Sequence, residues 1–160
     1  MNNVEFCLQD AFGVIDEVLS GGGEFRMYPK GVSMLPLIVQ GRDSVVLMRN
    51  TERPAKKYDI VFYRRKSGQF VLHRVMKIEK DGSYTMCGDN QTVLEKGIEK
   101  EQIIGYVARL YKGEKERNMN SFSYRLYVFF YCFMPLRKAI RFPKRVIMAI
   151  YRRVFRMNKS

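Results

Sequence analysis

Apolar and polar residues repeat at two different periods along this chain of 160 residues. Residues 4–19 place apolar side chains at helical spacing, and this period predicts an amphipathic helix. Ser20 and the three glycines at positions 21–23 predict that the helix ends there in a flexible break. We expect this helix to pack on its own domain, although it could instead bind a partner.

From residue 24 onward the pattern is typical of β-strands. Short runs rich in β-branched and aromatic residues are separated by turn signals such as Lys80-Asp81-Gly82. The expected strands are residues 24–28, 44–48, 59–63, 70–78, 83–87 and 103–110. Strands at this spacing, without alternating helices, predict a mainly β fold: a small rolled antiparallel sheet or barrel.

The last part of the chain has a different character. Residues 126–136 form an uncharged aromatic run that is too short to cross a bilayer alone, since a spanning helix needs about twenty apolar residues. Residues 144–157 place apolar side chains on one face and arginines on another, which is typical of an interfacial helix on anionic lipid. The alternatives are a basic helix packed on its own domain and a surface that binds nucleic acid.

The formal charge of +13 is concentrated in this tail. Residues 1–110 carry 16 Lys and Arg against 14 Asp and Glu, whereas residues 111–160 carry 13 against 2. Such an excess is attracted to polyanionic surfaces. We expect the partner of the tail to be an anionic membrane surface, because aromatic residues beside arginines favour the lipid headgroup region. Nucleic acid is the less favoured partner.

These patterns divide the chain into three parts: an N-terminal helix with its glycine break (1–23), a β core (24–112) and a basic, aromatic, partly helical tail (113–160) that associates with a membrane. The first residues lack the basic start and long apolar run of a secretory signal. We therefore expect a membrane-associated protein, attached peripherally or by its C-terminal tail, and favour the cytoplasmic side.

The three cysteines, Cys7, Cys87 and Cys132, have no metal-ligand spacing and form no disulfide framework. We interpret them as free thiols in a reducing compartment. Nothing in the sequence calls for a metal ion or an organic cofactor, so we expect none.

Candidate chemistry begins in residues 31–36, which have the sequence GVSMLP. Pro36 cannot donate a backbone hydrogen bond and moves Leu35 out of the helical region, while Gly31 permits a left-handed bend. Ser33 is therefore expected in a short, fixed loop, where by itself it would be an ordinary loop serine. His73, the only histidine, lies much further along the chain in a strand-like run.

Three ordered motifs, GxSMxP (31–36), HRV (73–75) and GDN (88–90), resemble those of the signal peptidase superfamily, which also contains the self-cleaving phage and SOS repressors. The histidine before Arg-Val is similar to the endoplasmic-reticulum-type branch, since the bacterial housekeeping branch has lysine there. The resemblance covers roughly residues 25–110 and implies a mostly β catalytic core. The chain departs from membrane-bound members in having no anchor helix just upstream of Ser33.

The resemblance implies that Ser33 is the nucleophile and His73 its general base. A serine hydroxyl needs a base within hydrogen-bond reach, and a neutral histidine can take its proton and return it to the leaving amine. An acid would orient the histidine. Asp89 is the first candidate, although it could instead cap a turn or pair with Arg74. Glu95, which stands where the endoplasmic-reticulum-type family often has an aspartate, is the second.

Two further roles follow from the resemblance. The backbone N–H of Ser33 is the natural donor to a developing oxyanion, and the sequence identifies no second donor because Gly31 stands where some relatives have a hydroxyl. Met34 and Pro36 are expected to shape the substrate-binding edge, or else to belong to the core.

The predicted function is that of a serine endopeptidase that cleaves a signal or leader peptide from a precursor polypeptide, and the family implies small side chains at the cleavage positions. One alternative is a regulatory self-cleaving peptidase, although no helix-turn-helix is evident ahead of the expected β core and the self-cleaving repressors use lysine as the base. Another is a catalytically silent membrane adaptor that keeps the fold and binds peptides.

Overall fold

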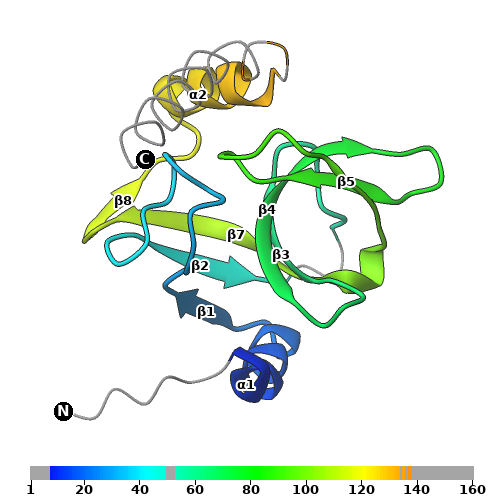
Figure 1. The fold of residues 1–160 in the computed structure, drawn as a ribbon. Coiled ribbons are helices and arrows are strands. Elements are labelled where there is room, and N and C mark those ends of the chain that lie inside the picture. The colour runs from blue at the N-terminus through cyan, green and yellow to red at the C-terminus, as the bar shows by residue number, and fades with distance from the viewer. Residues whose placement is uncertain (1–7, 50–52, 134, 136, 138–160) are drawn as a thin grey trace, which may run out of the picture.

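The computed structural model describes residues 8–49, 53–133, 135 and 137. Within them a single sheet of eight strands lies between an N-terminal and a C-terminal helix (Figure 1). The helix predicted at residues 144–157 and Cys7 fall outside the described residues.

Every strand pairs antiparallel with its neighbours, and the order along the sheet is β1-β2-β7-β3-β4-β5-β6, with β8 paired to β7. The sheet is not closed. The strands are β1 (Glu24–Met27), β2 (Ser44–Met48), β3 (Ile60–Arg64), β4 (Phe70–Ile78), β5 (Tyr84–Cys87), β6 (Glu95–Ile98), β7 (Ile103–Lys112) and β8 (Lys115–Arg117).

The prediction of a mainly β, antiparallel fold is confirmed, and the six expected strands are present with small shifts at their ends. Two strands were not predicted. β6 has the sequence Glu-Lys-Gly-Ile, in which only the isoleucine is a residue type common in strands. The segment is a strand because it pairs with β5. β8 follows β7 through a tight turn at Gly113, which extends the sheet to Arg117.

The sheet is strongly curved because its register shifts in four of the strand pairs. As a result β3 buries side chains on both of its faces. Ile60 and Phe62 belong to the larger apolar cluster, whereas Val61 and Tyr63 belong to a smaller one. Its neighbour β4 likewise has buried residues at successive positions, which lie on opposite faces of the sheet.

The helix α1 (Leu8–Ser20) packs on the domain, as its period predicts. Ile15 and Leu19 are buried in the larger cluster, and the ring of Phe12 lies 5.1 Å from that of Phe70. The glycine break follows directly, and β1 begins at Glu24.

The helix α2 (Phe122–Cys132) lies at the opposite end of the molecule from α1 (Figure 1). Its N-terminus is capped by Ser121, whose hydroxyl accepts a hydrogen bond from the amide of Tyr124 (3.2 Å). Tyr124, Val128 and Cys132, which share one face of the helix, are buried against the core. Among the described residues no helix has both the length and the apolar character needed to span a bilayer.

Candidate functional site

The loop that carries Ser33 is held by buried neighbours. Gly31 has a φ of +97°, a conformation that favours glycine, as the sequence predicts. Met34 and Ile38 are buried, and a turn is closed by the hydrogen bond from the amide of Ile38 to the carbonyl oxygen of Met34 (2.9 Å). Ser33 itself is partly exposed. The buried residues therefore anchor the loop, while Ser33 remains partly exposed at the surface.

The GDN motif (88–90) is hydrogen-bonded to this loop. The amide of Asn90 donates to the carbonyl oxygen of Ser33 (2.7 Å), and the Asn90 side chain donates to that of Val32 (2.9 Å). A Cβ atom at Gly88 would lie 2.6 Å from the Ser33 carbonyl oxygen and 3.1 Å from Nε2 of His73. Only glycine fits at this close approach.

His73 lies on β4, is 3 % exposed, and opposes Val61 of β3. Ser33 and His73 both line one cleft of about 200 Å³, together with Met34, Arg65 and Gln91. The structure thus brings the predicted nucleophile and base, which are far apart in the chain, to one place. No hydrogen bond between the Ser33 hydroxyl and His73 is present among the described residues, and such bonds often tighten only when substrate binds.

His73 is neutral at physiological pH. Its burial lowers the pKa to about 4, with a further lowering from the positive charge of Arg65 and opposing contributions from Glu95 and Asp89. A neutral imidazole is the form that can accept a serine proton. Burial therefore holds His73 in the form that can accept a proton.

The Nδ1 side of His73 faces two groups. The Tyr63 hydroxyl lies 3.2 Å from Nδ1, and Oε2 of Glu95 lies 4.0 Å from it. Tyr63 also donates a hydrogen bond to Oε2 of Glu95 (2.8 Å). Arg65 binds both oxygens of Glu95, at 2.7 and 2.6 Å, and these bonds lower the pKa of that carboxyl group.

Asp89 is directed elsewhere. Its two oxygens accept hydrogen bonds from Nε and Nη2 of Arg74, at 2.8 and 2.7 Å, and Tyr127 donates to Oδ2 (2.9 Å). Both side chains of the ion pair are completely buried. Since successive side chains of a strand point to opposite faces, Arg74 and its partner Asp89 lie across the sheet from the His73 ring. The geometry therefore favours Glu95 over Asp89 as the acid beside the histidine.

The two predicted substrate-edge residues differ in their positions. Met34 lines the cleft and is also packed in the core, with 4 % of its surface exposed. Pro36 is exposed and is not among the residues that line the cleft. The amide of Ser33 donates no hydrogen bond to any other described group.

Sequence reasoning missed several residues around the site. Tyr63 could have been found by pairing the strand at 59–63 with that at 70–78, because alternation would then place odd-numbered residues on one face. Arg65 lies just past the end of β3, so this argument does not reach it. Arg137 had no comparable signal. Its Nη1 donates to the carbonyl oxygens of Gly88 (3.0 Å) and Gln91 (2.8 Å), and so ties the segment after α2 to the site.

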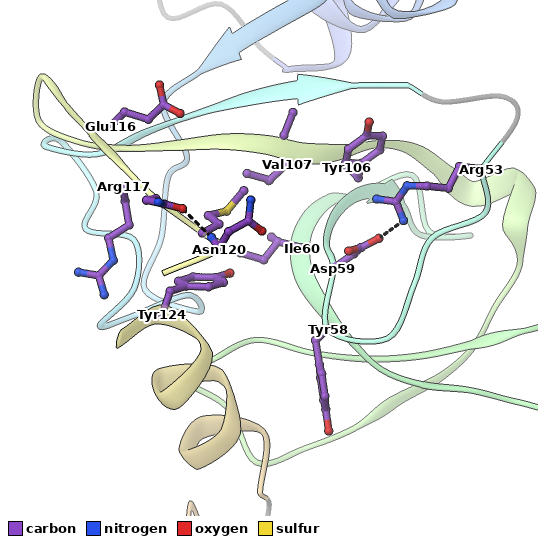
Figure 2. A pocket seen from close by; sticks show the side chains of 13 residues that line it. Arg53, Tyr58, Asp59, Ile60, Tyr106, Val107, Glu116, Arg117, Asn120 and Tyr124 are labelled. Atoms are coloured by element: carbon purple, nitrogen blue, oxygen red, sulfur yellow. Dashed lines mark hydrogen bonds and ion pairs between the residues drawn. The ribbon is translucent and has the colours of Figure 1, made fainter. Parts of the chain in front are cut away.

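A larger pocket, of about 550 Å³, shares no lining residue with this cleft. Its side chains are shown in Figure 2. It occupies the gap along β7 between the part paired with β3 and the part paired with β8. Figure 2 shows the ion pair of Arg53 and Asp59 on one side and Arg117 and Tyr124 on the other. None of the predicted catalytic residues lines it, so the smaller cleft is the candidate site despite its size.

Among the described residues, Cys87 and Cys132 are buried and form no disulfide, and no three His, Cys, Asp or Glu side chains are grouped as metal ligands would be. Comparisons of the chain with protein-family models, with curated proteins and with solved structures gave no match. The resemblance to signal peptidases accordingly rests on the three motifs.

Proposed function

We propose that this protein is a serine endopeptidase, resembling signal peptidases, that cleaves a signal or leader peptide from a precursor. The observation that carries the proposal is the convergence of Ser33 and a neutral, buried His73 on one cleft, with Gly88 held against both. Three motifs that are separate in the sequence meet there: the first supplies the proposed nucleophile, the second the proposed base, and the third holds the serine loop in place.

In the proposed reaction, the oxygen of Ser33 attacks the scissile carbonyl carbon while Nε2 of His73 takes the hydroxyl proton. The same nitrogen then protonates the leaving amine, and an ester to Ser33 remains. Water attacks the ester, His73 accepts its proton and returns it to Ser33, and the acid product leaves. The amide of Ser33 stabilises the oxyanion in both halves of the reaction.

The edge of β4 supports an extended peptide as the substrate. β5 pairs with residues 74–78 of β4, whereas residues 70–73 are paired with β3 alone in the described part of the sheet. Phe70, Val71 and Leu72 of this stretch line the cleft beside His73. A peptide in extended conformation could pair with such an edge and bring a peptide bond to Ser33.

The outer face of α2 supports attachment to an anionic membrane surface. Phe122, Phe129 and Phe133 are 79, 67 and 54 % exposed, and Leu126 and Phe130 lie between them. The chain that follows residue 137 is rich in Lys and Arg and has no Asp or Glu. Exposed aromatic residues beside basic charge fit the lipid headgroup region, so we assign the membrane, rather than nucleic acid, as the partner of this end.

The test is cleavage of a panel of signal-like and leader-like peptides in the presence of vesicles. Wild type is compared with Ser33→Ala, with His73→Ala and with a control, Ser67→Ala, which removes an exposed hydroxyl in the turn between β3 and β4. We expect cleavage to be lost in the first two variants while both remain folded at the assay temperature, and to be kept in the control.

Two other results would replace the proposal. Binding of these peptides by wild type without any cleavage would make the protein a silent peptide-binding adaptor. Cleavage of the chain itself, seen as a mass change that depends on Ser33, would instead point to a self-processing regulatory peptidase.

A further inference from the structure

The side chains of Tyr63 and His73 meet because of the register of β3 and β4. His73 opposes Val61, and Tyr63 is the next residue along the same face of β3. Diagonal neighbours on adjacent strands are within reach when one side chain is aromatic. The result is a buried contact of 3.2 Å between the Tyr63 hydroxyl oxygen and Nδ1 of His73.

The proton positions in this group follow from its charges. Two hydrogen bonds from Arg65 lower the pKa of Glu95, which is therefore a carboxylate and can only accept. Tyr63 has one hydroxyl proton and gives it to Oε2 of Glu95 at 2.8 Å. Burial, followed by the bond to Glu95, raises the pKa of Tyr63, so the phenol keeps this proton.

The Tyr63 oxygen is then left with lone pairs facing His73. A neutral imidazole next to an acceptor places its single proton on that side, on Nδ1. Its other nitrogen, Nε2, carries the lone pair and lies on the side of Gly88 and Ser33. The opposite tautomer would put a proton on the atom that has to receive the serine proton.

We propose that Tyr63 is a positioning residue that holds His73 in its Nδ1–H tautomer and links it to the carboxylate of Glu95, so that the acid acts on the histidine through a phenol. This inference rests on the proposed peptidase function for its effect on rate, but not for the tautomer itself. Glu95 lies 4.0 Å from Nδ1, too far for a direct hydrogen bond, and Tyr63 closes that gap.

The tautomer can be measured directly because His73 is the only histidine in the chain. In protein labelled with ¹⁵N-histidine, the two imidazole nitrogen shifts and their couplings to the ring protons distinguish the two neutral forms. We expect Nδ1–H in wild type at pH 7, and a mixture or the Nε2–H form in Tyr63→Phe. The control is Tyr84→Phe, which changes a buried tyrosine of the same cluster whose hydroxyl makes no hydrogen bond among the described residues.

The inference is overturned if wild type carries the proton on Nε2, or if Tyr63→Phe leaves the tautomer unchanged. Tyr63→Phe keeps the ring, and thermal melting together with the control shows that the fold is retained.

A second measurement is the rate of peptide cleavage. With a substrate cut by wild type in a Ser33-dependent reaction, we expect Tyr63→Phe to lower kcat at least about tenfold while KM stays within about twofold, and Tyr84→Phe to change neither. Equal kcat values for Tyr63→Phe and wild type would overturn the inference while leaving the peptidase in place. Absence of any cleavage would overturn the proposed function and leave the histidine tautomer as a separate result.

Discussion

The imidazole of His73 is buried on β4, and its titration follows from that burial. The unfolded chain titrates near pH 6.5 at this residue, whereas burial holds the pKa in the folded protein at about 4. Between these values the unfolded state binds more protons. The contribution of the neutral histidine to stability is therefore complete above about pH 6.5 and is lost as the pH falls toward 4.

We predict an acidic limit of peptide cleavage near pH 4, because the base stays neutral down to that pH. The measurement is kcat/KM across a pH series, together with a direct ¹⁵N titration of the single histidine. A midpoint close to the ordinary histidine value of about 6.5 in either experiment would mean that water solvates the ring, and would contradict the buried environment.

The choice between Asp89 and Glu95 is also made at the scale of single residues. The sequence offers both carboxylates at plausible distances along the chain. His73 and Arg74 are adjacent in a strand, so their side chains point to opposite faces of the sheet. Asp89 is paired with Arg74 and therefore lies on the face away from His73. Glu95 reaches the histidine side only because β6 pairs with β5, with Glu95 opposite Met86.

At the scale of elements, α2 has two different faces. One face buries Tyr124, Val128 and Cys132 on the β core, and the hydroxyls of Tyr124 and Tyr127 reach the ion pair of Arg74 and Asp89. The other exposes aromatic rings. An aromatic run in the sequence predicts an apolar segment, but its division between core and outer surface depends on where the helix packs.

We predict that the double variant Phe122→Ser/Phe129→Ser lowers affinity for phosphatidylglycerol vesicles by roughly tenfold or more, since each ring buries apolar area in the headgroup region. Co-sedimentation with vesicles across a salt series measures this. The control, Val14→Ser/Val93→Ser, removes two apolar residues that are 59 and 78 % exposed on other parts of the surface. Equal losses in both variants, or binding of DNA in place of vesicles, would reject a lipid-facing α2.

At the scale of the whole molecule, the ion pair of Arg74 and Asp89 joins parts that are distant in sequence. Arg74 comes from β4 and Asp89 from the turn after β5, while Tyr124 and Tyr127 of α2 complete the network. Arg74 also donates to the carbonyl oxygen of Tyr58 before β3. Breaking a buried pair leaves one charge without a partner, which costs about 3 to 5 kcal/mol.

We predict that Asp89→Asn lowers the thermal midpoint by about 6 to 12 °C or more, because it leaves the Arg74 charge buried. Glu101→Gln, which removes one exposed carboxylate, is the control and should change the midpoint by less than about 2 °C. The double variant Arg74→Met/Asp89→Leu should recover part of the loss.

The same variant separates a structural from an orienting Asp89. We expect the ¹⁵N shifts of His73 in Asp89→Asn to match those of wild type at a temperature where both are folded. A changed histidine tautomer would contradict this and would return Asp89 to the acid position.

The amino-acid sequence alone determined the local features of this protein: the period of α1, all the strands except β6 and β8, and the left-handed bend at Gly31. These depend on side-chain alternation and backbone sterics between near neighbours, which any window of the chain contains. The strands β6 and β8 could not be predicted from local patterns, because their residues are poor strand formers and become strands only by pairing with a neighbour.

Only the tertiary structure decided which side chains meet. Strand register set His73 beside Tyr63 and Arg74 beside Asp89, and the bulges that curve the sheet brought β6, with Glu95, to the histidine. A shift of the register by a single position would exchange the two faces. The sequence carries the residues of the candidate site, but their partners depend on pairings between separate segments of the chain, which no local pattern specifies.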